Sequence, residues 1–227
     1  MMIEIADDVF QISLFPRKAI NAYLLGSVLI DAGVRSSGGQ LRKAIGNRAL
    51  TAHVITHAHA DHQGASAFIC NAYNIPLWCG ARDIARAQTG LVIDEYPNPR
   101  GPIAQFQQRY WAGPGYPVAR ILREGDVVAD FHVIETPGHA SGHLAFWRER
   151  DRVLLAGDVL VNMDMLTTVA GLHEPPAMFT HDIQQNRQSI RKIASLMPKV
   201  VGFGHGPILH DISQLLELAN RHKEHGQ

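Results

Sequence analysis

Short apolar runs separated by turn residues dominate the first third of the chain. They occupy residues 9–15, 20–25 and 28–30, and the last of them ends at Asp31, Ala32 and Gly33. Short apolar runs bounded by such residues are typical of β-strands. The pattern therefore predicts a meander of strands, followed by a short helix at residues 41–45 and a buried strand at residues 52–56.

The same alternation of apolar runs and turns continues to the end of the chain. Further strands are predicted at residues 76–79, 118–122, 131–134, 143–147, 153–155 and 200–203. Helices are predicted at residues 62–73, 81–88, 183–196 and 212–221. Strands followed by helices, twice along one chain, indicate a layered β-sandwich flanked by helices.

A stretch rich in proline, glycine and aromatic residues interrupts this pattern at about residues 89–117. Its aromatic residues are Tyr96, Phe106, Tyr110, Trp111 and Tyr116. Such an insertion could cover an active site, or its rings could fill a small core beneath a surface loop. The pattern leaves both readings open. No linker divides the chain, so we expect a single domain spanning residues 1–227 with this insertion.

Composition narrows the possible partners. Apolar residues make up 46% of the chain and charged residues 19%, which is enough apolar material for a buried core. Lysine plus arginine equals aspartate plus glutamate at 21 each, so nucleic-acid binding loses its usual electrostatic support. Neither a secretory signal nor a membrane span is evident. We therefore expect a cytoplasmic protein with a small-molecule substrate, and the oligomeric state stays undetermined. Cys70 and Cys79 are predicted to be ordinary buried thiols.

The strongest chemical signal follows the strand predicted at residues 52–56. His57, His59, Asp61 and His62 stand within six residues. Imidazole nitrogen and carboxylate oxygen are ligands that suit zinc, iron or manganese. Imidazoles this crowded repel one another when protonated unless a cation takes up their lone pairs. The segment therefore predicts a metal site between a strand and the start of a helix.

Three further candidate ligands stand beside glycine, where predicted strands end. They are His139 in the sequence TPGHASGH, Asp158 after Gly157, and His205 between Gly204 and Gly206. Glycine lets the backbone turn tightly and approach a metal closely. Together with the first segment they complete the pattern HxHxDH, then H, D and H.

With this pattern in place, the chain resembles the metallo-β-lactamase superfamily, and its TPGHxxGH element is most similar to that of glyoxalase II and lactonase-type hydrolases. The resemblance spans about residues 20–210. It implies an α/β fold, a four-layer αββα sandwich with its ligands in loops along one edge. It also implies two divalent metal ions: His57, His59 and His139 would hold the first, Asp61, His62 and His205 the second, and Asp158 would bridge them. Zinc is the expected metal, with iron and manganese as alternatives.

The resemblance implies a hydrolase that uses a metal-bridging hydroxide to cleave a small thioester, lactone or related ester. Asp61 is the predicted catalytic residue, because it would orient the hydroxide and shuttle its proton. Lactam-cleaving members usually carry cysteine where Asp158 stands, so a β-lactamase is disfavoured. Glutathione specificity is not expected either, because only one predicted helix follows His205, whereas glyoxalase II carries a larger helical region there.

Other reaction classes remain open. A mono-iron persulfide dioxygenase shares the HxHxDH cluster and the fold, and spacing does not separate it from the hydrolase. A phosphodiesterase of the same superfamily is less expected, because the chain is short and neutral. A metal-binding protein without turnover is the remaining alternative.

Several residues receive secondary predictions. Asp31 could accept a hydrogen bond from a ligand histidine, or simply form a turn. His143 is predicted to be a hydrogen-bonded structural residue rather than a ligand. Met163, Met165 and Phe179 could line a hydrophobic pocket, or could merely fill space.

Overall fold

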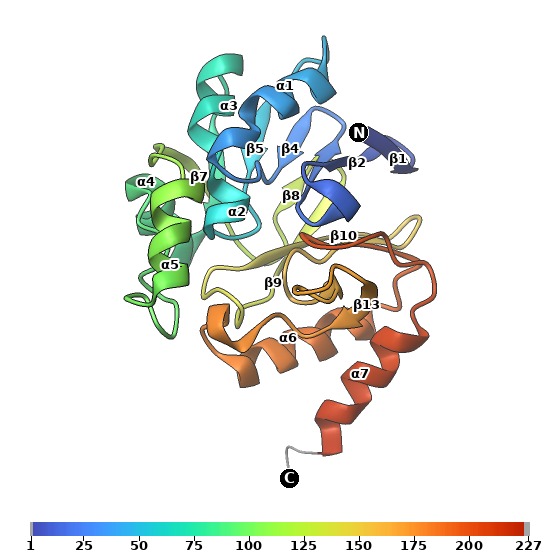
Figure 1. The fold of residues 1–227 in the computed structure, drawn as a ribbon. Coiled ribbons are helices and arrows are strands. Elements are labelled where there is room, and N and C mark those ends of the chain that lie inside the picture. Colours follow the sequence, from blue (N-terminus) through green and yellow to red (C-terminus); the bar gives the residue numbers. More distant parts are fainter. Residues whose placement is uncertain (1, 225–227) are drawn as a thin grey trace.

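Two β-sheets pack face to face in the middle of the molecule, and helices cover both outer faces (Figure 1). The computed structural model describes residues 2–224. Seven strands form the first sheet, in chain order: β1 (Met2–Ala6), β2 (Val9–Ser13), β3 (Asn21–Leu25), β4 (Val28–Ile30), β5 (Ala52–Val54), β6 (Leu77–Gly80) and β7 (Val118–Leu122). Strands β1 to β4 pair antiparallel, and β4 to β7 pair parallel.

The second sheet has five strands, in the order β14, β11, β10, β9, β8. Their bounds are β8 (Val127–Val128), β9 (Phe131–Glu135), β10 (Leu144–Arg148), β11 (Val153–Leu155) and β14 (Val200–Gly202). Strand β14 runs parallel to β11, and the other neighbours are antiparallel. A small hairpin of β12 (Val161–Met163) and β13 (Ala170–His173) lies apart from both sheets.

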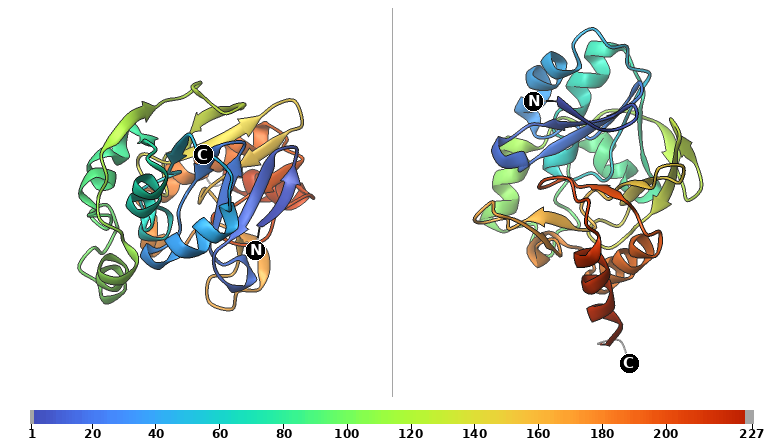
Figure 2. Two further views of the ribbon diagram at one scale, coloured as in Figure 1. Left: turned by 90° about the horizontal axis from the view of Figure 1, so that it is seen from above. Right: turned by 90° about the vertical axis from the view of Figure 1, so that its right-hand side faces the viewer.

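Alternating side chains explain the layers. On β3, Ala22 and Leu24 pack toward the helices α1 (Gly38–Ile45) and α3 (Ser66–Tyr73), whereas Tyr23 and Leu25 face the second sheet. The far face of the second sheet packs against α6 (Ile183–Ser195) and α7 (Ser213–Glu224). The right-hand view of Figure 2 places α1 and α3 at one end and α7 at the other. Burial on both faces of each sheet confirms the predicted four-layer αββα sandwich.

The remaining helices lie beside the sandwich, where the predictions were less accurate. The helix predicted at 62–73 is divided into α2 (Ala60–Gln63) and α3, because the chain turns out of helical geometry at Ala65. A side chain at Gly64 would collide with the backbone of Arg35 and of Trp111, so the break lets the insertion pack closely. The helix predicted at 81–88 is a short 3₁₀ turn followed by α4 (Ile84–Thr89).

The insertion also contains structure that the pattern did not predict. Helix α5 (Pro102–Phe106) begins with proline in its first turn, and a π-helical turn at Gln107–Trp111 continues it. Strands β1, β8, β12 and β13 were not predicted either. Strands β8, β12 and β13 are too short to show a period of two.

Cys70 and Cys79 are free and buried, as predicted, and burial raises the pKa of each thiol to about 12. Within residues 2–224, every helix is too short or too polar to cross a membrane.

Candidate metal centre

The loops at one edge of the two sheets bring the predicted ligands together. Strands β11 and β14 are parallel neighbours, so the loops after them open at the same edge of the second sheet. The contact between His62 and Asp158 places the segment after β5 beside these loops. His57 and His59 lie between β5 and α2, and Asp61 and His62 lie in α2 itself. The three downstream residues occupy the other loops: His139 between β9 and β10, Asp158 after β11, and His205 after β14.

Asp158 lies at the centre of this group. Its Oδ2 atom is 3.0 Å from Nε2 of His205, 3.4 Å from Nε2 of His62 and 3.7 Å from Nε2 of His139. His62 and His205 belong to one predicted set of ligands and His139 belongs to the other. One carboxylate therefore reaches both sets, which is the position that a bridging ligand requires.

The first predicted set consists of three imidazoles packed against one another. The ring centroids of His57, His59 and His139 are 4.4 to 5.0 Å apart. Burial lowers the pKa of His57 and of His59 well below the usual value, and neighbouring imidazoles add to the effect for both. Burial also lowers the pKa of His139 to about 4, although Asp158 opposes it. At neutral pH these rings are uncharged, which is the form that binds a metal.

The second set pairs two imidazoles with carboxylates. Nε2 of His205 is 3.3 Å from Oδ2 of Asp61, and Nε2 of His62 is 4.0 Å from Oδ1 of Asp61. Burial disfavours the charged form of His205, but Asp158 and Asp61 outweigh it and raise its pKa to about 10. The pKa of His62 is raised in the same way by Asp158 and Asp31. A metal bound here would have to displace protons, so its affinity should fall as the pH falls.

The unpartnered atoms of the site fit a metal. Nε2 of His57, Nε2 of His62 and Oδ1 of Asp158 are buried and have no hydrogen-bond partner. Leaving buried polar atoms unpaired is costly, so an arrangement that gathers several of them implies a missing partner. His57, His59 and His139 offer ligand atoms within 4.8 Å of one another, and so do Asp61, His62 and His205. Nitrogen and carboxylate oxygen in this arrangement suit a divalent transition metal.

The absence of a side chain at Gly204 lets the backbone lie close to Asp158 and His62. A side chain there would collide with Oδ1 of Asp158 and would also meet the ring of His62. The glycine before His205 therefore serves close packing of the site.

Hydrogen bonds to the outer ring nitrogens hold the imidazoles in place. Asp31 accepts a bond of 2.8 Å from Nδ1 of His62, which confirms the first of the two roles predicted for it. The hydroxyl of Thr56 accepts from Nδ1 of His57 at 3.0 Å, and the Ala19 carbonyl accepts from Nδ1 of His205 at 2.5 Å. Such partners fix the tautomer and direct Nε2 toward the centre.

His143 plays the structural part predicted for it. Its Nδ1 pairs with the Thr136 hydroxyl at 2.8 Å, and its Nε2 accepts from the backbone N–H of Asp158 at 3.0 Å. Both ring nitrogens are thus engaged, and the ring supports the loop that carries Asp158.

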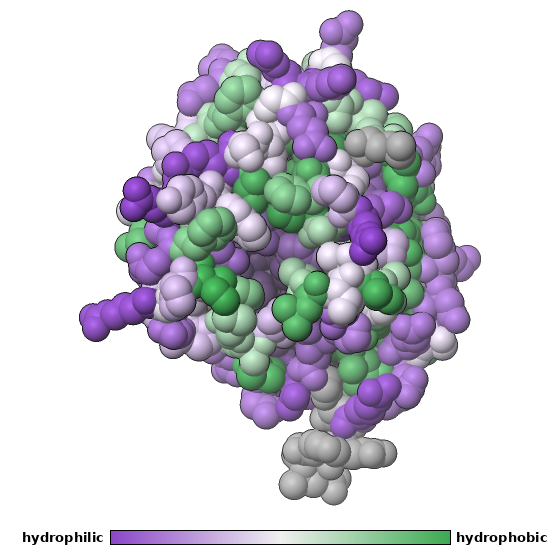
Figure 3. Space-filling model, viewed as in Figure 1, coloured by the Kyte–Doolittle hydropathy of each residue, from purple (hydrophilic) through white to green (hydrophobic). Residues whose placement is uncertain are grey.

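A cavity of about 610 Å³ opens directly onto these residues. Figure 3 shows it as a hollow near the middle of this face, with apolar side chains around its rim. Met163, Met165 and Phe179 line it, which is the first of the two possibilities left open for them, and Leu166 at its mouth is 95% exposed. Ile103 and Met178 also line the cavity and are about half exposed, and a group of exposed apolar side chains beside a site indicates a surface that meets a ligand.

The insertion contributes both to this cavity and to a small core, so both readings of it hold in part. Tyr96 and Trp111 line the cavity. Val92, Ile93 and Ala104 pack with Tyr96 against Ala60 at the start of α2. By contrast, Tyr110 is 56% exposed and is not among the residues that line the cavity. The sequence marks these aromatic residues as a group, but no local pattern distinguishes Tyr96 and Trp111, which line the cavity, from Tyr110, which does not.

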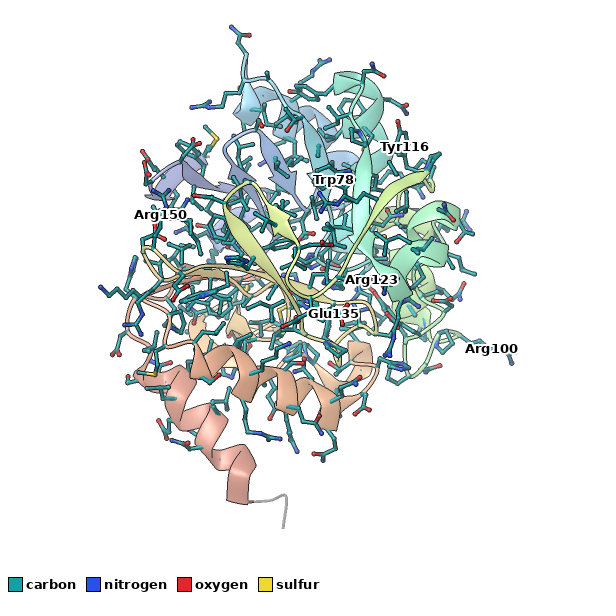
Figure 4. The ribbon with its side chains drawn as sticks, turned by 180° about the vertical axis from the view of Figure 1, so that it is seen from behind. Trp78, Arg100, Tyr116, Arg123, Glu135 and Arg150 are labelled. Carbon is teal, nitrogen blue, oxygen red and sulfur yellow. The ribbon has the colours of Figure 1, made fainter. Side chains whose placement is uncertain are left out.

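A second, smaller cavity has a volume of about 210 Å³. Arg123 and Glu135 both line it, and Figure 4 shows them close together in the view from behind. Its walls carry charges of both signs.

Comparison with known proteins agrees with this geometry. The sequence profile described as the metallo-beta-lactamase superfamily matches residues 16–205, a range that contains every residue of the candidate centre. The probable metallo-hydrolase YflN of Bacillus subtilis (strain 168) is 34% identical over 218 residues, which cover 86% of this chain and 81% of YflN. A hydroxyacylglutathione hydrolase of Bdellovibrio bacteriovorus is 25% identical over 156 residues, which cover 67% of this chain and 47% of that enzyme.

Solved structures are similar over nearly the whole chain. The protein TTHA1623, in a di-iron-bound form, has 28% identity and a TM-score of 0.68, with coverage of 93% of this chain and 97% of that one.

Proposed function

Because the chain belongs to the metallo-beta-lactamase superfamily, we propose that it is a metallo-hydrolase with two divalent metal ions that cleaves a neutral, largely apolar ester, lactone or thioester. The observation that carries this proposal is the position of Asp158 between two sets of imidazoles at the floor of an apolar cavity.

The ligands follow from the distances within the site. His57, His59 and His139 would hold one ion, Asp61, His62 and His205 the other, and Asp158 would contact both. When bound, two such ions lower the pKa of a water molecule and polarise the carbonyl that it attacks. Zinc is the proposed metal, and iron is the alternative because the similar protein TTHA1623 holds two irons.

Asp61 is proposed to handle the proton. Its side chain is 14% exposed and lines the cavity, whereas that of Asp158 is 5% exposed. Burial opposes its ionisation, but the hydrogen bond and charge of His205 and the charge of His62 lower its pKa. As a carboxylate at the cavity floor, it can accept a hydrogen bond from the attacking water and carry the proton toward the leaving group.

Tyr96 is proposed to donate a hydrogen bond to the reacting carbonyl. Its ring stacks edge-on against His59 with centroids 4.7 Å apart, and its hydroxyl is hydrogen-bonded to the Ala60 backbone. Burial, together with the charges of Asp61 and Asp158, raises the pKa of this phenol well above its usual value. The group therefore keeps its proton and can serve as a donor to developing negative charge.

Replacing Tyr96 by phenylalanine should lower kcat by about 100-fold, since one lost oxyanion donor costs about 10² to 10³ in rate. The ring that packs against His59 is retained, so metal content should not change. Steady-state kinetics of the metal-loaded variant measures the effect, and Tyr110→Phe provides the matched control, because it removes a hydroxyl from the same insertion outside the cavity. Equal kcat values for the two variants would remove Tyr96 from the mechanism.

The lining of the cavity supports a neutral substrate. Among the described residues that line it there is no lysine or arginine, and its mouth carries the acidic residues Asp164 and Glu174. Glutathione and coenzyme A esters and phosphodiesters are anions, and sites that bind anions normally supply cationic side chains. An apolar acyl group or a lactone ring matches the methionine and aromatic walls better.

A substrate panel tests this proposal on protein of measured metal content. Neutral acyl esters and lactones should be hydrolysed with kcat/KM at least tenfold above that for glutathione thioesters or phosphodiesters, and chelation should abolish the activity. A single bound iron with oxygen consumption on a persulfide would instead establish the dioxygenase. Hydrolysis confined to anionic substrates would refute the proposed preference for neutral ones.

A further inference from the structure

Glu95 carries a buried carboxylate that the ligand pattern does not account for. It lies in the segment that joins α4 to α5 (Figure 1), and its carboxylate comes within 4.0 Å of the predicted ligand His59. Its side chain is 6% exposed, and its Oε1 atom is buried without a hydrogen-bond partner. Burying a carboxylate oxygen without a hydrogen-bond partner is costly, so the position of Oε1 of Glu95 calls for an explanation.

The other oxygen of Glu95 is firmly held. Oε2 accepts the backbone N–H of Ser141 at 3.1 Å and lies 3.2 Å from Nη2 of Arg86. The Arg86 guanidinium donates to Asp83 at 2.5 Å and to the Ser141 hydroxyl at 2.9 Å. These bonds fix the direction in which Oε1 points.

The unpartnered oxygen points at a predicted metal ligand. Oε1 of Glu95 is 4.0 Å from Nε2 of His59, and Nε2 of His59 is itself buried without a hydrogen-bond partner. Two complementary unpaired atoms therefore face each other across a gap that a small rotation of either side chain would close. The other four predicted histidine ligands all form a hydrogen bond through Nδ1: His57, His62, His139 and His205. In His59 it is Nε2 that faces a carboxylate oxygen.

The same network also holds the backbone of the ligand segment. Oδ2 of Asp83 accepts the N–H of Ala58 at 3.0 Å, between the two ligands His57 and His59. Arg86 thus contacts both Asp83, which accepts a hydrogen bond from the backbone of this segment, and Glu95, which faces the side chain of His59. An imidazole N–H turned toward Oε1 of Glu95 would supply the donor that this oxygen lacks.

We propose that Glu95 is a positioning residue that accepts the Nε2–H of His59 and thereby presents Nδ1 of His59 to the first metal ion, with Arg86 holding Glu95 in place. The inference rests on the proposed metal centre but is independent of the substrate. Outer-sphere carboxylates of this kind raise metal affinity by about 10- to 100-fold.

The test measures metal binding. Glu95→Gln keeps an oxygen that can accept from Ser141 and Arg86, but removes the negative charge and can turn an amide N–H toward His59. Its affinity for zinc, measured by competition with a chromophoric chelator, should fall about 10- to 100-fold. Asp94→Asn is the matched control: its carboxylate is 46% exposed, lies 3.5 Å from Nη1 of Arg86 and has no histidine contact, so its affinity should stay at the wild-type value.

Two further measurements separate positioning from other roles. The metal-free Glu95→Gln variant should melt within a few degrees of the metal-free Asp94→Asn variant. At saturating cobalt(II), its visible spectrum should match that of the wild type, because the atoms bound to the metal are unchanged.

Three outcomes would overturn the proposal: wild-type zinc affinity in Glu95→Gln, an affinity loss that merely follows loss of apoprotein stability, or an altered cobalt spectrum, which would make Glu95 a direct ligand. If the wild-type protein itself binds no metal, the proposed function fails first, and the two failures are thereby distinguishable.

Discussion

Replacement of Asp158 by alanine is expected to abolish hydrolysis and to reduce the metal content to one ion or fewer. The Oδ2 atom of this residue lies within 3.7 Å of three imidazoles. His62 and His205 outweigh the burial of Asp158 and hold its pKa well below the usual range, so the residue is a carboxylate at neutral pH. Truncating one partner of a buried charge pair weakens binding by about 2 to 5 kcal/mol. At about 1.4 kcal/mol per tenfold change, this corresponds to a loss of metal affinity of roughly 30- to 4,000-fold.

Asp158→Asn sharpens the test, because it preserves the shape of the side chain and removes only the charge. It should retain the fold while losing most of the second metal ion, as measured by elemental analysis after dialysis. Asp130→Asn is a suitable control, since Asp130 is a half-exposed carboxylate whose ion pairs with Arg148 and Arg150 lie outside the predicted ligands. Full metal occupancy and undiminished turnover in the Asp158 variants would contradict the assignment of this residue as the bridge.

Much of the sandwich could be predicted because its strands carry a strong local signal. Strands β4, β7 and β11 have the predicted bounds. Strands β4 and β11 consist of buried apolar residues between turn residues, whereas β7 is a largely exposed edge strand that Pro117 precedes. The hairpin of β12 and β13 was missed because its pairing depends on contacts with each other rather than on an alternating pattern. The break between α2 and α3 was also beyond prediction, because the insertion that packs at Gly64 is distant in sequence.

The candidate centre could be predicted for a different reason. Its residues are chemically unusual together, so their spacing alone marks them, and the structure gathers all seven at one edge of the sandwich. Glu95 and Tyr96 gave no such signal, because a single acidic or aromatic residue in an irregular segment is common. Their roles depend on where the insertion folds back onto α2, and that is decided by packing against Ala60 rather than by local sequence.

Asp31 provides a test that couples the stability of the fold to the metal centre. This carboxylate is 1% exposed and accepts the backbone N–H of Thr56 at 2.7 Å and Nδ1 of His62 at 2.8 Å. Its φ of 60° lies in the left-handed region, which aspartate and asparagine tolerate better than alanine. Asp31→Ala should therefore destabilise the protein by about 3 to 5 kcal/mol, because it leaves buried donors unpaired. For a chain of this length that corresponds to a fall in Tm of roughly 10 °C.

Two companion variants divide this effect into its causes. Asp8 also has a positive φ, of 55°, but is exposed, so Asp8→Ala measures the backbone contribution alone and should cost only about 1 to 2 kcal/mol. Asp31→Asn keeps the backbone preference and one acceptor oxygen, yet it cannot serve both Thr56 and His62 as a carboxylate does. It should lose less stability than Asp31→Ala, because it keeps an acceptor for one of the two residues, while binding metal about 10- to 100-fold more weakly, because the ring of His62 loses its charged partner. Equal losses of stability in Asp8→Ala and Asp31→Ala would mean that Asp31 matters only for the shape of its turn.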